Sequence, residues 1–150
     1  MESMTAWIER DSDGSYLLTF PGLPGATFGA TLQEAQAHGW DLLESILMDR
    51  MADRADLPKS KKVKLQDWTK PFKSGYYAIP IAGLSQLKLA LYLEMRAKGI
   101  RKAKLAKLTG LSATQVDRLL NLKHESKLEL LELTICRLGL KLPITLLKAA

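Results

Sequence analysis

The chain has little of what secreted, membrane-bound or metal-dependent proteins use. Among its 150 residues there is one cysteine and there are two histidines, so an internal disulfide is excluded and no local spacing builds a zinc site. No uncharged apolar run approaches the roughly 20 residues that span a bilayer. The first residues also lack the basic and then apolar pattern of a signal peptide. We therefore expect a cytoplasmic protein without membrane contact, metal or cofactor, in which Cys136 is a buried thiol.

Residue patterns typical of catalysis are also missing. His38 and His124 are far apart in sequence, and neither belongs to a recognisable arrangement with a cysteine, a serine and an acid. Gly22, Gly25 and Gly29 are surrounded by prolines and strand-forming residues rather than by the start of a helix, so they do not form a phosphate-binding loop. The sequence therefore predicts no catalytic residues and no enzymatic activity.

Charge is distributed unevenly along the chain, which says more than the net charge of +6. Residues 1–58 carry three Lys and Arg against ten Asp and Glu, a net charge of −7. Residues 59–73 carry a net charge of +5, and residues 74–150 carry +8. A basic half suits phosphate groups, whereas an acidic half repels nucleic acid and suits a basic protein. The sequence therefore predicts two different partners.

The first part of the chain is rich in strand-forming residues. Turns containing Asp, Gly and Pro separate the expected strands, which cover residues 4–9, 15–20, 26–28 and 76–81. Thr31 and Glu34 have the spacing of a capping box, which predicts the start of a helix over 31–51. Gly39 weakens that helix, and its lack of a side chain suggests that the helix lies close to a sheet.

The segment 59–73 (KSKKVKLQDWTKPFK) is a basic connecting loop. Two interpretations stay open for it. It is either a solvated linker or a nucleic-acid contact. The second interpretation depends on Trp68 and Phe72, which are interleaved with the lysines and could stack on bases.

Residues 101–120 (RKAKLAKLTGLSATQVDRLL) carry the clearest motif. Two short amphipathic segments meet at Gly110, which can adopt the left-handed conformation that ends a helix. Ser112, with a glutamine three residues later, predicts a capping box at the start of the second segment. The residues expected to face the core are Leu105, Val116, Leu119 and Leu120. This order is typical of a helix-turn-helix.

The second segment of this motif, over 112–121, would be the recognition helix. Its outward residues suit the major groove, because Gln can bond adenine, Arg can bond guanine and small methyl groups can touch thymine. The predicted base-reading residues are Ala113, Thr114, Gln115 and Arg118. The predicted phosphate-binding residues are Arg101, Lys102, Lys104, Lys123 and Lys127. Asp117 argues mildly against this reading, because phosphate repels a carboxylate.

Helical periodicity continues on both sides of the motif. Ser85 is expected to cap a helix that ends near Gly99. Ser126 is expected to cap a second helix, with a glutamate three residues later completing a capping box. A last short helix is expected over 144–148, after a proline.

These elements together predict an α+β fold with two domains. The first, over 1–82, is an acidic β-β-β-α-β domain that includes the basic loop 59–73. The second, over 83–150, is an all-α helix-turn-helix domain that would bind DNA and dimerise.

Two stretches of the sequence resemble a known family. SYLLTFPGLPGATFGATLQEA (15–35) resembles the amino-terminal domain of HicB antitoxins, from HicAB toxin–antitoxin systems. The resemblance lies in the aromatic-rich strand, in the loop 20–25, in Gly29 and in the helix start at 31–35. VDRLLNLKHESKLELLELTICRLGLKL (116–142) is similar to the helix-turn-helix variant of the same family. Together the likeness covers nearly the whole chain.

This resemblance implies a partial RNase H-like first domain that caps HicA, a small basic toxin that cleaves mRNA. It also implies a dimeric second domain that binds the operator of its own operon. It places no toxin-contacting residue and no catalytic carboxylates on this sequence. The expected partners are thus a HicA-type toxin, operator DNA and a second copy of the chain, or more. Two alternatives stay open: a stand-alone transcriptional regulator whose first domain senses a ligand or protein, and a nuclease on an RNase H-like scaffold.

Overall fold

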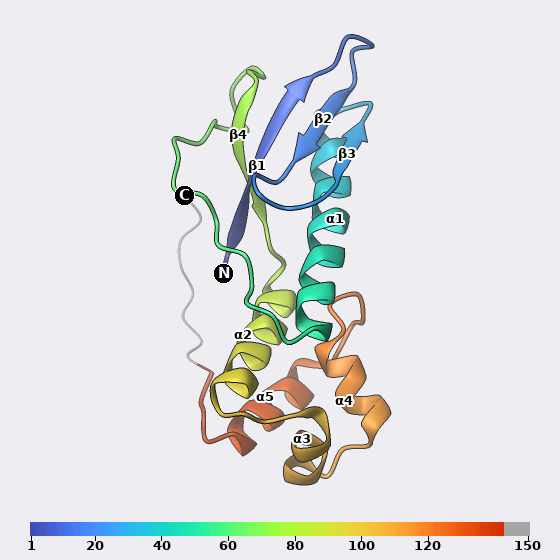
Figure 1. Ribbon diagram of the computed structural model, residues 1–150, viewed down its shortest axis with the longest axis vertical. Helices are drawn as coiled ribbons and strands as arrows, with labels where there is room; N and C mark the ends of the chain where they lie inside the picture. The colour runs from blue at the N-terminus through green and yellow to red at the C-terminus, as the bar shows by residue number, and fades with distance from the viewer. Residues whose placement is uncertain (143–150) are drawn as a thin grey trace. The chain divides into compact units, whose positions relative to one another are not determined.

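The structure is a computed structural model that describes residues 1–142. The chain divides into two compact units, Met1–Gln86 and Leu87–Ala150, which we describe separately. The sequence predicted a boundary after residue 82, and the division between the compact units falls after residue 86. The first unit holds the sheet, and the helix-turn-helix lies in the second (Figure 1).

The strands and helices follow the order expected from the sequence. They are β1 (Ser3–Arg10), β2 (Tyr16–Thr19), β3 (Ala26–Gly29), α1 (Leu32–Ala52), β4 (Gly75–Pro80), α2 (Gly83–Ala97), α3 (Lys102–Thr109), α4 (Ala113–Leu120) and α5 (Leu128–Arg137). This arrangement confirms the predicted α+β fold class, while the likeness to RNase H stays a prediction. The expected helix over 144–148 lies outside the described residues. None of the helices in residues 1–142 has the length and hydropathy needed to cross a bilayer.

Two predicted helix starts are wrong. Helix α2 begins at Gly83, before the predicted cap Ser85. Helix α5 follows Lys127 and has no side-chain cap. The hydroxyl of Ser126 instead donates to the backbone carbonyl of Arg118 (3.4 Å), because the end of α4 offers a carbonyl acceptor close by.

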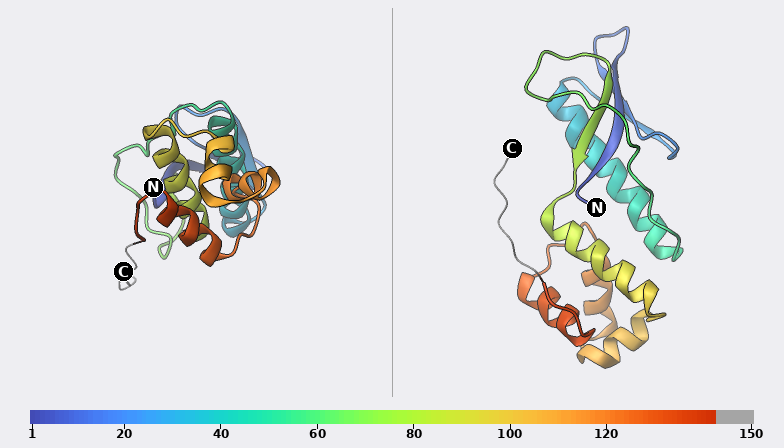
Figure 2. Two further views of the ribbon diagram at one scale, coloured as in Figure 1. Left: turned by 90° about the horizontal axis from the view of Figure 1, so that it is seen from below. Right: turned by 90° about the vertical axis from the view of Figure 1, so that its left-hand side faces the viewer.

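The first unit is a four-stranded antiparallel sheet with one helix. The strand order is β3-β2-β1-β4, so the fourth strand returns beside the first, as the sequence predicted. Helix α1 lies along one face of this sheet (Figures 1 and 2). Ile8 of β1 and Leu18 of β2 are direct partners in the register, and both are completely buried.

Two glycines allow α1 to lie close to the sheet. A Cβ atom on Gly39 would lie 2.6 Å from Cδ1 of Leu18, which is too close for any real side chain. A Cβ atom on Gly29, at the end of β3, would lie 2.1 Å from the backbone nitrogen of Ala35. The predicted close approach of the helix at Gly39 is therefore confirmed, and Gly29 fixes how β3 meets the first turn of α1.

Both outer edges of the sheet are partly occupied. On β3, Nδ1 of His38 donates to the carbonyl of Phe28 (2.7 Å). On β4, the carbonyl of Tyr76 accepts from the backbone N–H of Gln66 (2.7 Å). The next outward residue, Ala78, accepts from Nε1 of Trp68 (3.0 Å). Pro80 lies two residues further along β4, so its backbone faces the same edge, and as a proline it has no N–H that could donate to an added strand.

The basic connecting loop folds onto the sheet. The ring centroids of Trp68 and Tyr77 lie 4.6 Å apart, and those of Phe72 and Tyr16 lie 4.9 Å apart. The N–H and hydroxyl of Thr69 both donate to one oxygen of Asp67, and these bonds lower the pKa of its carboxyl group. Because both aromatic rings pack within the unit, base stacking by these rings is not favoured. A nucleic-acid contact stays a prediction for the exposed lysines of the loop.

Candidate nucleic-acid interface

The turn between α3 and α4 is built as the sequence predicted. Gly110 has a φ of 74°, in the left-handed region, and its N–H donates to the carbonyl of Ala106 at the end of α3 (2.9 Å). The hydroxyl of Thr109 donates to the carbonyl of Leu105 (2.7 Å) and accepts from the N–H of Leu111 (3.3 Å). Three residues, 110–112, therefore connect two short helices.

Helix α4 starts with a complete capping box. The backbone N–H of Gln115 donates to Oγ of Ser112 (3.2 Å), and the backbone N–H of Ser112 donates to Oε1 of Gln115 (2.9 Å). This exchange satisfies two N–H groups that the first turn of a helix otherwise leaves unpaired. The predicted cap is confirmed.

The two helices share a buried core. Leu105 of α3 and Val116 and Leu119 of α4 have no exposed surface, whereas Leu120, also expected inside, is half-buried. Burying a leucine or valine side chain stabilises a fold by about 1.5–3 kcal/mol relative to exposure. The inward face of α4 therefore fixes which residues it presents to solvent.

The exposed residues of α4 include every predicted base reader. They are Ala113, Thr114, Gln115 and Arg118, and Asp117 lies among them. Gln115 uses its Oε1 atom in the capping box, so a bidentate bond to adenine, which needs both the oxygen and the nitrogen, would open that box. Arg118 is exposed in the last turn of α4. Their roles in reading bases stay predictions.

The predicted phosphate contacts are also exposed. They are Arg101, Lys102, Lys104, Lys123 and Lys127. Arg101 is the N-cap residue of α3 and makes no side-chain cap bond, and Lys127 holds the same position before α5. Lys102 differs from the others because its Nζ lies 2.7 Å from Oδ1 of Asp117. The carboxylate that argued against DNA contact is therefore ion-paired with the preceding helix.

A buried lysine holds the end of α4. Lys88 of α2 has no exposed surface. Its Nζ donates to the backbone carbonyls of Arg118 (3.2 Å), Asn121 (2.7 Å) and His124 (2.5 Å). A buried cation is tolerated when it is fully hydrogen-bonded, and the C-terminal end of a helix favours positive charge. Lys88 therefore fixes the turn of α4 that carries Arg118.

Sequence reasoning missed Lys88, although a signal for it exists. It follows Leu84 by four residues and precedes Leu91 by three, which places it on the same helical face as these apolar residues. A charged residue on such a face indicates either that the apolar face is interrupted there or that the charged group is buried and hydrogen-bonded. Its acceptors lie 30 to 36 residues away, so the sequence alone could not identify them.

Cys136 corrects another expectation. The sequence predicted a buried thiol, but this side chain is exposed. The core of α5 is formed by Leu131, Thr134 and Ile135, and these residues occupy the opposite side of the helix. The sequence around Cys136 places apolar residues on all sides of the helix. The pattern therefore did not define which face of α5 packs into the core.

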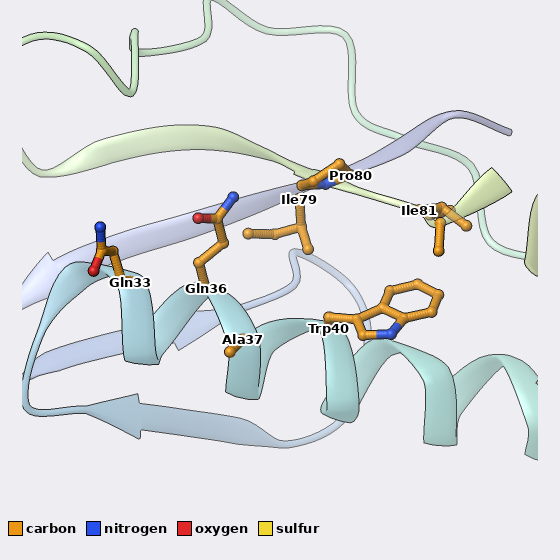
Figure 3. Close-up of a pocket in the computed structure, with 8 residues that line it drawn as sticks. Gln33, Gln36, Ala37, Trp40, Ile79, Pro80 and Ile81 are labelled. Carbon is orange, nitrogen blue, oxygen red and sulfur yellow. The ribbon is translucent and has the colours of Figure 1, made fainter. Parts of the chain in front are cut away.

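The first unit has a separate hollow between α1 and β4 (Figure 3). It has a volume of about 400 Å³ and is mostly apolar. Trp40 of α1 faces Ile79 and Ile81 across it, and Gln33 and Gln36 supply amide groups at one end. Within residues 1–142, no three His, Cys, Asp or Glu side chains gather as a set of metal ligands. The hollow therefore suits an apolar group with a few polar atoms.

Comparison with known proteins agrees with the geometry of the second unit. Residues 91–138 match the model of the Cro/C1-type helix-turn-helix DNA-binding domain. This range contains α3 and α4 and the turn between them.

A second comparison concerns most of the chain. This chain is 29% identical over 131 residues to an antitoxin HicB of Pseudomonas fluorescens (strain Pf0-1). The alignment covers 87% of this chain and 84% of that protein. Because 131 residues exceed the length of either compact unit, the alignment includes parts of both. The resemblance that the sequence predicted is confirmed.

Proposed function

We propose, from its similarity to an antitoxin HicB and its Cro/C1-type helix-turn-helix domain, that this chain is an antitoxin and an autorepressor. Its first unit binds a HicA-type toxin and blocks mRNA cleavage. Its second unit binds the operator of the operon that encodes both proteins. The observation that carries the proposal is that one alignment to an antitoxin spans parts of both units.

The charge and the surface of the second unit support the operator half of the proposal. Residues 87–150 carry 13 Lys and Arg against five Asp and Glu. Exposed cations flank α4 at the start of α3 and in the segment before α5. Such residues set affinity and register on the phosphate backbone, and the exposed face of α4 would read bases.

The acidity of residues 1–58 supports the toxin half, although the basic loop 59–73 brings the whole first unit to a net charge of −2. Residues 1–58, which hold three strands and α1, carry a net charge of −7. A basic toxin would be attracted to the acidic side chains of residues 1–58, and such attraction raises the association rate more than the final affinity. Fast capture suits an inhibitor that must act before its target cleaves RNA.

The proposal includes three further statements. The antitoxin works in the cytoplasm, where its operator and the mRNA occur. It acts as a homodimer or larger oligomer through the second unit, because helix-turn-helix proteins read paired half-sites about one DNA turn apart. It has no catalytic activity of its own, and metal-dependent RNA cleavage by the purified, toxin-free chain would contradict this statement.

Co-purification with the product of the adjacent small basic gene tests the toxin half. RNA cleavage is then measured with and without this chain. We expect a tight complex that silences cleavage. If there is no complex, or if the partner lacks RNase activity, the toxin half fails, and operator binding by the chain alone is then tested separately.

The hollow between α1 and β4 favours one alternative, a stand-alone regulator that senses a ligand. Its volume of about 400 Å³ and its mixed lining of Trp40, Ile79 and the glutamines would accommodate a small molecule. The two functions differ in genetic context, because the alternative needs no toxin gene beside this one. They also differ in the effect of Trp40→Ala. For a regulator that senses a ligand, this change would alter DNA affinity only in the presence of the ligand.

A further inference from the structure

The capping box at the start of α4 uses the amide oxygen of Gln115. Its Oε1 atom accepts from the backbone N–H of Ser112 (2.9 Å), and the backbone N–H of Gln115 donates in return to Oγ of Ser112 (3.2 Å). A backbone N–H can only donate, so the atom that it bonds must be the carboxamide oxygen and not the nitrogen. The box therefore fixes which end of the amide faces the backbone.

The amide nitrogen of Gln115 is left for another partner. The side chain is exposed, and within residues 1–142 its only hydrogen bond is the one at Oε1. Helical side chains lean toward the N-terminus of their helix, so this amide lies over the first turn of α4. In a helix-turn-helix, the first residues of the second helix contact base edges in the major groove. Nε2 would thus bring two N–H donors, and no acceptor, to that groove.

The major-groove edges of the four bases differ in what they offer to a donor. Guanine and thymine present a keto oxygen, O6 or O4, at the place where adenine and cytosine present an amino group, N6 or N4. A lone donor can bond the keto oxygen, whereas the amino group opposes it. N7 is common to both purines, so it does not discriminate between them. The usual pairing of glutamine with adenine also needs the amide oxygen to accept from N6, and in α4 that oxygen is already used.

We infer that Gln115 selects a keto base, guanine or thymine, through Nε2 while its Oε1 atom stays in the capping box. The inference rests on the proposed operator binding and names what one residue reads there. Opening the box would leave the N–H of Ser112 unpaired at the start of α4. The box also holds the amide in one orientation before DNA binds, which lowers the entropy lost on binding. A single bond discriminates less than a bidentate pair, so we expect a preference of about fivefold for keto over amino bases.

Gln115→Glu tests the inference and leaves the box intact. Glutamate is a usual partner of serine in a capping box, so it supplies the same acceptor to Ser112 and replaces the Nε2 donor with a second acceptor. The full-length wild type and the variant are each used to select binding sites from DNA duplexes with a randomised centre. We expect one position of the selected sites to change from guanine or thymine to cytosine, whose N4 donates to a carboxylate.

Ala103→Glu is the matched control for the added negative charge. Ala103 lies in α3, is exposed and has no part in the capping box. Because the new carboxylate is repelled by phosphate whatever the sequence, this variant should bind all duplexes more weakly. It should keep the base preferences of the wild type at every position.

A pair of variants at Ser112 tests the role of its backbone N–H. Ser112→Ala removes Oγ but keeps the N–H, so Oε1 of Gln115 stays occupied and the keto preference should remain. Ser112→Pro also removes the N–H, at a residue whose φ of −70° suits a proline ring. Because Oε1 is then released, the same position should change toward adenine, which glutamine bonds through both amide atoms. If the proline variant does not fold in urea-denaturation controls, Gln115→Glu still decides the question.

Two results would overturn the inference. One is an amino base, adenine or cytosine, selected by the wild type at the position that Gln115→Glu changes. The other is a Gln115→Glu variant with the base preferences of the wild type, which would leave Gln115 as a helix cap without a role in reading bases. Failure of the proposed function is seen separately, in the wild type alone, as a chain that enriches no sequence from the randomised duplexes and does not bind the DNA upstream of its own gene.

Discussion

Lys102 of α3 and Asp117 of α4 form an ion pair across the helix-turn-helix, with 2.7 Å between Nζ and Oδ1. Their side chains are 62% and 60% exposed, so the pair contributes little to folding, on the order of 0.2–1 kcal/mol. We expect its larger effect on DNA binding, because the carboxylate neutralises a lysine that is predicted to contact phosphate.

Asp117→Asn should therefore strengthen binding to operator DNA and to unrelated DNA alike. The change removes a repelled carboxylate and frees Lys102 for a phosphate, which would steepen the salt dependence of binding by about one unit of slope. Fluorescence anisotropy over a salt series measures both effects. Glu94→Gln is the control, because it breaks the ion pair between Glu94 of α2 and Lys98, which follows that helix, and changes the net charge equally. An equal gain from both variants would mean that only net charge matters.

Arg118→Ala should weaken operator binding about tenfold or more while leaving toxin binding unchanged. A bidentate bond between arginine and guanine contributes about 1–3 kcal/mol of discrimination. Arg118→Lys keeps the charge but loses the planar fork, so it should retain binding to unrelated DNA and lose preference for the operator. Operator affinity equal to wild type in the alanine variant would remove Arg118 from the reading surface.

Lys88→Met should destabilise the second unit by about 1–3 kcal/mol, because three backbone carbonyls lose a charged donor. Urea denaturation measures the loss. At temperatures where the variant is folded, its preference for operator over unrelated DNA should also fall, since the turn carrying Arg118 is less fixed. Lys98→Met, at an exposed position directly after the same helix, should change stability by less than about 0.5 kcal/mol. Equal effects of the two variants would contradict the role of Lys88.

Gly29→Ala should destabilise the first unit by about 3 kcal/mol, because the added methyl group meets the backbone of α1 and neither can move freely. Toxin inhibition should then be lost at lower temperature than in the wild type, while operator binding by the second unit persists. Gly83→Ala is the matched control, since no atom lies within 4 Å of the added methyl group. Loss of both activities together would show that the two units fold as one.

The sequence predicted best those features that depend on neighbouring residues. Gly110, Ser112 and Gln115 define the turn of the helix-turn-helix through contacts within three residues, and each was found as expected. The position of Lys88 depends on carbonyls 30 or more residues away, and the sequence contains no local sign of them. Gly39 is intermediate, because its position in a helix indicated a close approach but not that Leu18 would be the residue approached.

Where local sequence patterns were ambiguous, tertiary contacts determined which side chains are buried and which partners they bond to. Cys136 lies in a helix with apolar residues on several sides, and packing of Leu131 and Ile135 into the core turned it outward. Ser126 has the spacing of a cap but bonds to the end of α4 instead. The candidate site was therefore predictable in its motif and its exposed residues, but not in the contacts that hold it.

The occupied sheet edges limit how a partner can bind the first unit. His38 on one edge, and Trp68 and Pro80 on the other, use or remove groups that an added strand would need. We therefore expect a partner to recognise side chains rather than to extend the sheet by main-chain pairing, which is largely independent of sequence. For an antitoxin, this distinction would let inhibitors encoded at different loci in one cell each remain dedicated to their own toxin, and we expect the partly blocked edges to disfavour polymerisation of excess free inhibitor through its strands.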